Sequence, residues 1–313
     1  MTVKSKSFLL LLFSVLIYAI LKALITTEIL SEYFEQVLLY TIIVIIVSLG
    51  LNLIYGYTGQ FSLGHAAFYG IGAYTSALLC RIFNIENAFA YIPVIVFSGV
   101  FAGFIGYIIG IPILRLKDDF LAIATLGFGV LVRVFLDNSD RISDTLGGSR
   151  GFIGIPKITN LEIVFFSAIV LILLTKNLIN SRYGLYLKTI KSDELATTSL
   201  GIDTSKMKLL AFTIGCFLAG IGGSLYAHLY TFLHPSNFDI LKSIDFLVIV
   251  IIGGMGSISG TVIASVLWVG LIEGLRNFLP TEWMDLRWVI IPILLIIIMM
   301  LKPEGLFVKK TVR

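Results

Sequence analysis

A stretch of glycines and polar residues is the part of this sequence best suited to contact a polar solute: Gly56-Tyr57-Thr58-Gly59-Gln60-Phe61-Ser62-Leu63-Gly64-His65. Gln60, Ser62 and His65 offer both hydrogen-bond donors and acceptors. Gly59 and Gly64 allow the backbone to leave helical geometry. The polar side chains could line a route for a solute, or they could satisfy the backbone of a broken helix and cap the next one. The residue types favour these two interpretations equally.

A second stretch of this kind follows late in the chain: Gly253-Gly254-Met255-Gly256-Ser257-Ile258-Ser259-Gly260. It shares the pattern G-x-x-G-x-x-S with the first stretch, although the residues after the pattern do not align. Paired hydrophobic segments interrupted by glycine mark the translocation route in transporters built from internal repeats. The candidate solute route therefore consists of Gly59, Gln60, Ser62, Gly64, His65, Gly253, Gly256 and Ser259.

Both stretches interrupt a chain that is too apolar for a water-soluble protein. Hydrophobic residues make up 58% and charged residues 13% of its 313 positions, and the mean hydropathy is +0.99. Uncharged runs such as 37–54 and 88–114 match the roughly 20 residues that a helix needs to cross a bilayer. The fold class is therefore all-α, a polytopic transmembrane helical bundle. Broken backbone at membrane depth must be buried in protein or face a wet cavity.

We expect about ten membrane segments: 8–25, 37–54, 66–82, 91–113, 120–136, 161–179, 209–232, 244–254, 261–277 and 286–301. The third and eighth are the least certain to span fully, because they are polar-flanked or short. Basic residues concentrate near the amino end, in 180–208 and in 302–313. The positive-inside rule then places 180–208 and both termini in the cytoplasm and 145–156 outside. No cleavage site follows the first segment, so we expect it to be retained.

The cytoplasmic loop 180–208 contains a predicted short amphipathic helix. Ser192 is the expected N-cap, Asp193 and Glu194 suit the first turn, and Gly201 suits the C′ position after the last turn. This helix could lie on the membrane surface as a connector, or it could dock into a groove on a cytoplasmic motor. The residues expected to take part in docking are Asp193, Glu194, Leu195, Ala196, Leu200, Gly201 and Ile202.

Several activities are excluded or disfavoured. The chain lacks a G-x-x-x-x-G-K-[ST] phosphate loop and an H-E-x-x-H motif, and its three histidines are scattered, so we expect no enzyme, no metal site and no cofactor. The net charge of +4 is too small to indicate nucleic-acid binding. Cys80 and Cys216 lie in apolar segments and are expected to pack as small hydrophobic residues. The outer loop is rich in glycine and suits close approach by a partner or solute, through Gly147, Gly148, Gly151 and Gly154.

Four motifs in a fixed order resemble those of a known family. They are the stretch from Gly56 to Phe68, the Gly147-Gly148-x-x-Gly151 run ending in Gly154-Ile155-Pro156, the loop 193–202, and Gly253-Gly254-Met255-Gly256. Together they resemble the LivM-type permeases of branched-chain amino-acid ABC importers, over about residues 37–307. The resemblance implies an ABC importer permease fold with broken helices, in a single transmembrane permease domain over 1–313.

The resemblance also implies partners and a place in the cell. It suggests three kinds of partner: a LivH-type permease paralogue, two cytoplasmic ATPase subunits that bind the ATP, and a periplasmic or lipid-anchored solute-binding protein. It places this chain in the bacterial plasma (inner) membrane, in contact with membrane lipid. It favours the coupling role for 180–208. One departure is that Gly201 follows Glu194 by seven positions, where the general ABC coupling motif has six.

With this resemblance, the expected function is that of a permease subunit in ATP-driven uptake of leucine, isoleucine or valine. Two alternatives stay open: a urea or short-amide permease of the same superfamily, and a stand-alone secondary transporter. No cluster of acidic residues within the segments suggests an ion-coupling site, which disfavours the secondary transporter.

Overall fold

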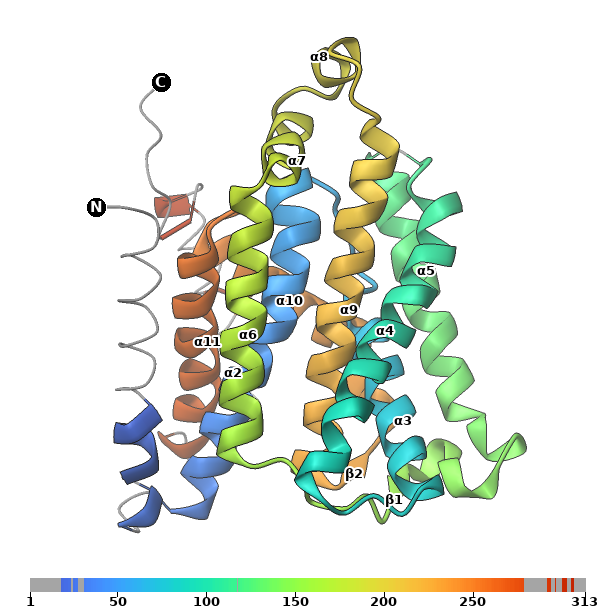
Figure 1. Cartoon of the computed structure of the whole chain (residues 1–313), viewed down its shortest axis with the longest axis vertical. Coiled ribbons are helices and arrows are strands. Elements are labelled where there is room, and N and C mark those ends of the chain that lie inside the picture. The colour runs from blue at the N-terminus through green and yellow to red at the C-terminus, as the bar shows by residue number, and fades with distance from the viewer. Residues whose placement is uncertain are drawn as a thin grey trace.

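The computed structural model describes residues 18–23, 25–27, 31–116, 118–278, 292–293, 296, 300–302 and 305–306. Within them, eight longer helices form the bundle in Figure 1: α2 (Glu32–Leu51), α3 (His65–Ile82), α4 (Ala88–Ile113), α5 (Asp118–Asp137), α6 (Leu161–Asn180), α9 (Thr204–Tyr230), α10 (Ile240–Gly253) and α11 (Ile258–Phe278). Two shorter helices, α7 (Arg182–Ser192) and α8 (Glu194–Ser199), join α6 to α9. The strands β1 (Phe152–Ile153) and β2 (Phe232–Leu233) pair antiparallel, with Phe152 opposite Leu233.

The predicted segments from the second to the ninth correspond to these eight helices. Six helical stretches have the length and apolar composition of membrane spans: Glu32–Gly56, Ala88–Ile113, Phe120–Asp137, Leu161–Asn180, Thr204–Tyr230 and Ile258–Asn277. The predicted segments 8–25 and 286–301 lie largely outside the described residues. The chain is therefore a multi-pass, all-α membrane protein. The described residues support six spans by this criterion, and the expected number of about ten is not established.

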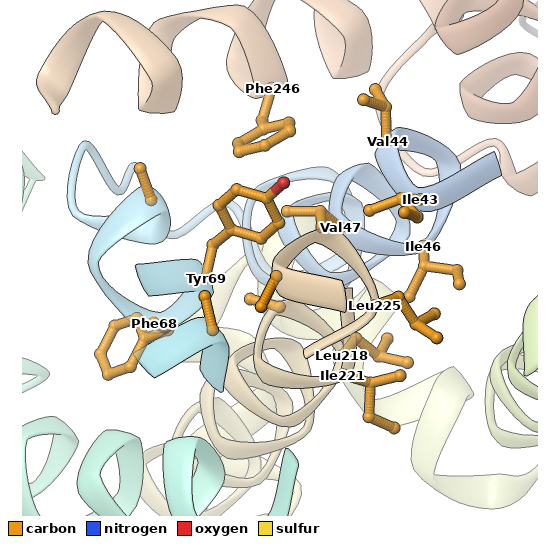
Figure 2. Packing of buried hydrophobic residues seen from close by; sticks show 14 of the residues in the cluster. Ile43, Val44, Ile46, Val47, Phe68, Tyr69, Leu218, Ile221, Leu225 and Phe246 are labelled. Carbon is orange, nitrogen blue, oxygen red and sulfur yellow. The ribbon is translucent and has the colours of Figure 1, made fainter. Parts of the chain in front are cut away.

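Helix α9 occupies the centre of the bundle and packs against α2, α3 and α4 through small residues. A Cβ atom at Gly223 would lie 1.9 Å from the carbonyl oxygen of Tyr69 in α3, and one at Gly215 would lie 2.7 Å from that of Gly50 in α2. Figure 2 shows the apolar layer beside this seam, where Leu218 and Leu225 of α9 face α2. The closely spaced small residues of the sequence are thus packing seams, as expected from their spacing.

The two functional loops lie at opposite ends of the bundle. Figure 1 shows α7 and α8 at one end and the β1–β2 pair at the other, which we call the α8 end and the β1–β2 end. This agrees with the prediction that 180–208 and 145–156 lie on opposite sides of the membrane. Which end faces the cytoplasm stays a prediction from the basic residues.

The glycine-rich loop near the β1–β2 end is not a simple connector. Its four glycines all have positive φ, between +51° and +83°. Such angles are strained for other residues and explain the glycine-rich sequence. The segment that follows is held by two side chains from the bundle: Arg81 donates to the Ile153 carbonyl over 3.1 Å, and a ring nitrogen of His228 lies 2.9 Å from the Pro156 carbonyl oxygen. The loop is therefore anchored to α3 and α9.

Candidate functional site

The first broken element begins where α2 changes into a π-helical turn, Asn52–Gly56. The chain leaves helical geometry at Gly59, which has φ +76°, and becomes helical again at His65. Two neighbouring helices satisfy backbone groups that the break sets free. The Thr125 hydroxyl of α5 accepts from the Leu63 amide at 3.1 Å, and the Ser243 hydroxyl of α10 accepts from the Ala66 amide at 3.0 Å. Polar side chains from other elements thus stabilise this break.

The second broken element separates α10 from α11. Helix α10 ends at Gly253, and α11 starts at Ile258. Between them, Gly254 has a φ of +96° and Gly256 a φ of +84°. In the shared G-x-x-G-x-x-S pattern, Gly256 corresponds to Gly59, and both have the left-handed conformation. The short sequence match therefore reflects a shared backbone geometry at its middle glycine.

The two breaks contact each other through Asn52. The side chain of Asn52 is 1% exposed. Its Oδ1 accepts from the Gly256 amide at 2.9 Å, and its Nδ2 donates to the Ser257 carbonyl at 3.2 Å. A Cβ atom at Gly56 would lie 2.6 Å from the Gly256 nitrogen, so glycine is needed there for the close approach. Asn52 was not among the predicted site residues, although it is the one amide side chain in the uncharged run 37–54. An isolated polar residue in a span is itself a signal.

A lysine connects this contact to the loop at the α8 end. Lys191, near the end of α7, donates from Nζ to the Gly56 carbonyl oxygen over 2.7 Å. Desolvation at this contact lowers the pKa of the Lys191 ammonium. Lys191 directly precedes Ser192 and Asp193, where the coupling helix was predicted to begin. Lys191 thus joins the loop at the α8 end to the π-helical turn of the first break.

The polar residues of the predicted route differ in their surroundings. Gln60 is 4% exposed, and neither of its amide atoms has a hydrogen-bond partner within the described part of the chain. The Ser62 hydroxyl is likewise buried without a partner there. His65 is buried, with Nε2 3.0 Å from the Val47 carbonyl oxygen. Ser259 is exposed at the second break. The structure thus brings Gly56 and Gly256 together, but Ser259 does not share the buried environment of Gln60.

The unpartnered amide of Gln60 leads to a prediction about solute transport. Because this amide has no hydrogen-bond partner among the described residues, Gln60→Leu is expected to preserve thermal stability and to lower uptake. In contrast, His65→Ala removes a buried side chain and its hydrogen bond to the Val47 carbonyl, at a cost of about 1–3 kcal/mol. Melting temperature and uptake per folded complex, measured for both variants, check this expectation. Unchanged specific uptake in both would remove the two residues from the solute route.

Two glycines of the first break allow a paired test of backbone conformation and close approach. A Cβ atom at Gly64 would lie 2.3 Å from the Thr125 carbonyl oxygen. At Gly59 the nearest atom to such a Cβ is 3.7 Å away, but the backbone of Gly59 has a φ of +76°. Gly64→Ala must push α3 from α5, which we expect to cost about 1–3 kcal/mol. For Gly59→Ala the expected cost is the smaller left-handed penalty of about 1–2 kcal/mol. Thermal unfolding in detergent ranks the two, and a larger loss at Gly59 would contradict this assignment.

The predicted helix in 180–208 exists, but it begins one residue later than expected. Ser192 ends α7, and its hydroxyl donates to the Lys188 carbonyl at 3.1 Å. The N-cap of α8 is Asp193, whose carboxylate accepts from the Ala196 amide at 3.0 Å. The prediction of Ser192 as the cap was therefore wrong. Gly201 has φ +82° directly after the C-cap residue of α8, at the predicted C′ position.

Helix α8 presents apolar side chains to the exterior at its end of the bundle. Leu195 is 82% and Leu200 76% exposed. Glu194 is an ion-pair partner of Lys208 in α9, with 2.6 Å between Oε1 and Nζ. Large exposed leucines on a short helix that is held to the bundle suit docking to another protein. Asp193 caps this helix, while Ala196 and Ile202 lie beside the two leucines in sequence.

Comparison with known proteins agrees with this architecture. The family described as "Branched-chain amino acid transport system / permease component" matches residues 33–300. The high-affinity branched-chain amino acid transport system permease protein LivM of Escherichia coli is 34% identical over 300 residues, covering 85% of this chain and 68% of the relative. A probable LivM permease of Methanocaldococcus jannaschii is 24% identical, covering 90% of this chain and 95% of the relative.

The chain is also similar to the second type of permease in these systems. LivH of Salmonella typhimurium is 23% identical over 283 residues, covering 83% of this chain and 90% of the relative. No solved structure matches the chain. The family match spans both breaks and the loop between α6 and α9, and the E. coli relative covers most of the chain. The chain therefore belongs to the family of permease components of branched-chain amino acid transport systems.

Proposed function

We propose that this chain is the membrane-spanning permease subunit of an ABC importer that moves leucine, isoleucine and valine into the cytoplasm. The proposal rests on family membership and on the LivM relatives, which are named for this transport. The observation that carries it is the contact of two broken helices through Asn52, with Lys191 linking that contact to α8. Such an arrangement suits a passage that opens and closes, because a few bonds hold both interrupted segments.

The chain acts together with other subunits in this proposal. A LivH-type paralogue completes the permease, which fits the similarity of this chain to both types. Two cytoplasmic ATPase subunits bind the ATP, so the chain itself needs no cofactor and is not an enzyme. A binding protein delivers the solute at the β1–β2 end, beside Gly147, Gly148, Gly151 and Gly154. The location is the plasma (inner) membrane, with both termini cytoplasmic.

ATP hydrolysis by the ATPase subunits acts on the permease through α8. The residues from Asp193 to Ile202 dock to an ATPase subunit, and closure of the ATPases displaces α8. Lys191 transmits this displacement to the Gly56 carbonyl, and Asn52 transmits it to the second break. The motor thereby favours one arrangement of the breaks over the other, which is how binding energy shifts a two-state equilibrium.

Uptake by the reconstituted system tests the function. The chain is co-expressed with its neighbouring transport genes, and the complex is placed in proteoliposomes with labelled leucine, valine, urea and acetamide. The expected result is ATP-dependent uptake of the amino acids only. Urea or acetamide uptake would favour the amide permease, and leucine uptake by this chain alone, without ATP, would indicate a secondary transporter.

The topology is tested separately by cysteine labelling. The positive-inside rule predicts that a cysteine at Thr198 in α8 reacts only from the cytoplasm and that one at Ser149 reacts from outside. Both side chains are exposed at opposite ends of the bundle, so a membrane-impermeant maleimide should label one of them in intact cells. Labelling of Thr198→Cys from outside would reverse the orientation and remove the ATPase docking role of α8. A third position, Lys309, lies outside the described residues.

A further inference from the structure

A pair of opposite charges lies within the bundle, away from the two breaks. Lys242 and Asp245 are one turn apart on α10, and their Nζ and Oδ2 atoms are 3.2 Å apart. Lys242 also donates to the hydroxyl of Tyr40 in α2. Helix α2 starts at Glu32 at the β1–β2 end, so Tyr40 lies about 12 Å along the helix from that end, at 1.5 Å per residue. The contact of Lys242 with Tyr40 therefore lies along the candidate span Glu32–Gly56, inside its first end.

The charged side chains are accessible although aromatic rings surround them. Their accessible fractions are 25% for Lys242 and 31% for Asp245. The Lys242 Nζ is 5.2 Å from the centre of the Tyr40 ring and 5.7 Å from that of Phe246. At this depth, accessible charges face a protein partner or a water-filled cavity, since exposure to hydrocarbon costs several kcal/mol. The exposed face of this turn of α10 therefore borders a wet passage or another protein.

The pair has hydrogen-bonding capacity left over. An ammonium has three donor hydrogens, and within the described part of the chain Lys242 uses two of them, on Tyr40 and Asp245. A carboxylate can accept about four hydrogen bonds, and Asp245 accepts from Lys242. The buried Tyr69 hydroxyl also lacks a partner there, and Figure 2 shows it directed toward the α10 layer near Phe246. The site thus offers spare groups of both charge signs to a ligand.

We propose that Lys242 and Asp245 form a recognition point for the zwitterionic part of an amino acid in the solute route. Lys242 binds the carboxylate and Asp245 binds the ammonium, so that the solute replaces part of their mutual ion pair. The exposed side chains of Leu241 and Ile244 on the same turn, 60% and 39% accessible, suit a branched apolar side chain. This inference rests on the proposed amino-acid transport and adds the residues that select the solute.

Neutral and singly charged solutes would not match this site. Urea has no charge to exchange with the ion pair, and an amine or a carboxylic acid alone would satisfy one partner and leave the other unpaired. A phosphatidylethanolamine headgroup carries the same two charge signs and is the other possible source of such a ligand. The experiment therefore uses liposomes of phosphatidylcholine and phosphatidylglycerol without this lipid, and adds it in one arm.

The first test is the reactivity of Asp245→Cys in the whole importer. Cys80 and Cys216 are buried, and both are replaced with alanine in the parent. We expect the new thiol to react from outside with the anionic reagent sulfonatoethyl methanethiosulfonate and with its cationic trimethylammonium analogue at different rates. The reaction with the anion should be about tenfold faster, which corresponds to a preference of about 1.4 kcal/mol. Lys242→Met in the same background should abolish this preference. A pair that is covered by another protein would give no reaction and no preference.

Protection by the solute completes the labelling test. Leucine supplied with the binding protein during turnover should slow the reaction at least about threefold, whereas urea should not. Val100→Cys, on the exposed face of α4, is the control and should stay unreactive, because a thiol facing hydrocarbon does not ionise. Protection by added phosphatidylethanolamine but not by leucine would assign the site to lipid and overturn the proposal, and so would an unreactive Asp245→Cys.

Uptake separates this inference from the proposed function. Lys242→Met and Asp245→Asn are expected to lower leucine uptake at least about tenfold, or 1.4 kcal/mol in the free energy that governs it. Arg115→Met, which removes one positive charge at an exposed position just after the end of α4, should leave uptake unchanged. If the wild-type importer takes up no leucine, the proposed function fails. If it does, and both variants transport normally, only the recognition point is wrong. Should Lys242→Met fail to assemble, the labelling of Asp245→Cys still decides.

Discussion

Replacement of Asn52 with leucine is expected to lower ATP-driven leucine uptake at least about tenfold, or 1.4 kcal/mol in free energy, and to lower the melting temperature of the complex. Leucine has the same branched arrangement of side-chain heavy atoms as asparagine, but it cannot accept from the Gly256 amide or donate to the Ser257 carbonyl. Interhelical hydrogen bonds in membranes contribute about 0.6 kcal/mol on average and 1.7 at most. A buried amide left unpaired adds about 1–3 kcal/mol. The stability loss should therefore lie near 1–3 kcal/mol.

The loss of uptake should exceed what this instability explains. In the proposed mechanism Asn52 transmits a displacement of the first break to the second, and Asn52→Leu removes both bridging bonds. Thr41→Val is the matched control, since the Thr41 hydroxyl bonds only the Val37 carbonyl of its own helix within the described chain. Uptake is measured per assembled complex, alongside thermal unfolding and ATP hydrolysis. Normal specific uptake by a destabilised Asn52→Leu complex would show that the bridge is structural only.

The second large effect is expected from Leu195→Asp in α8. Leu195 is 82% exposed, so a charge there costs this chain little stability, within the roughly 0.5 kcal/mol typical of surface substitutions. If the leucine packs into a groove on an ATPase subunit, the carboxylate opposes burial in the centre of that interface. The complex should then insert normally but lose most of its ATP-driven uptake. ATP hydrolysis should no longer respond to binding protein loaded with leucine.

Leu195→Asp is a sharper probe than a change at Glu194. The Glu194 carboxylate pairs with Lys208, so Glu194→Lys would bring two positive charges together and disturb the loop as well as the docking. Ser205→Asp serves as the control, because it adds the same charge at an exposed position in the first turn of α9, where the helix dipole favours an acid. Full coupling in Leu195→Asp, with the control behaving alike, would place the ATPase contact elsewhere.

Local chemistry explains which features the sequence alone determined. Long uncharged runs have to be helices in a bilayer, since their backbone groups find no partner in hydrocarbon. The helices α2 to α6, α9, α10 and α11 thus coincide with predicted segments, with shifts of a few residues at their ends. Gly59 and Gly256 adopt positive φ at the two predicted interruptions. Gly201 does so after α8, because glycine tolerates this conformation without a steric penalty.

The prediction of the cap of α8 failed where two neighbouring residues compete for one role. Ser192 and Asp193 are both good N-cap residues. The Ser192 hydroxyl instead bonds back to the Lys188 carbonyl as α7 ends, and the extended backbone of Asp193 aims its carboxylate at the Ala196 amide. Sequence shows that a cap exists here, but the extent of the preceding helix decides which residue provides it.

Contacts between distant residues were decided by the tertiary structure alone. Asn52 meets Gly256 across 204 positions, Lys191 meets Gly56 across 135, and Lys242 meets Tyr40 across 202. Hydropathy and glycine spacing act over a few residues and say where a helix breaks. They do not say which polar group reaches the freed backbone or the buried charge. Those partners depend on how α7 and α10 pack against α2, and a buried polar group is stable only where that packing brings it a partner.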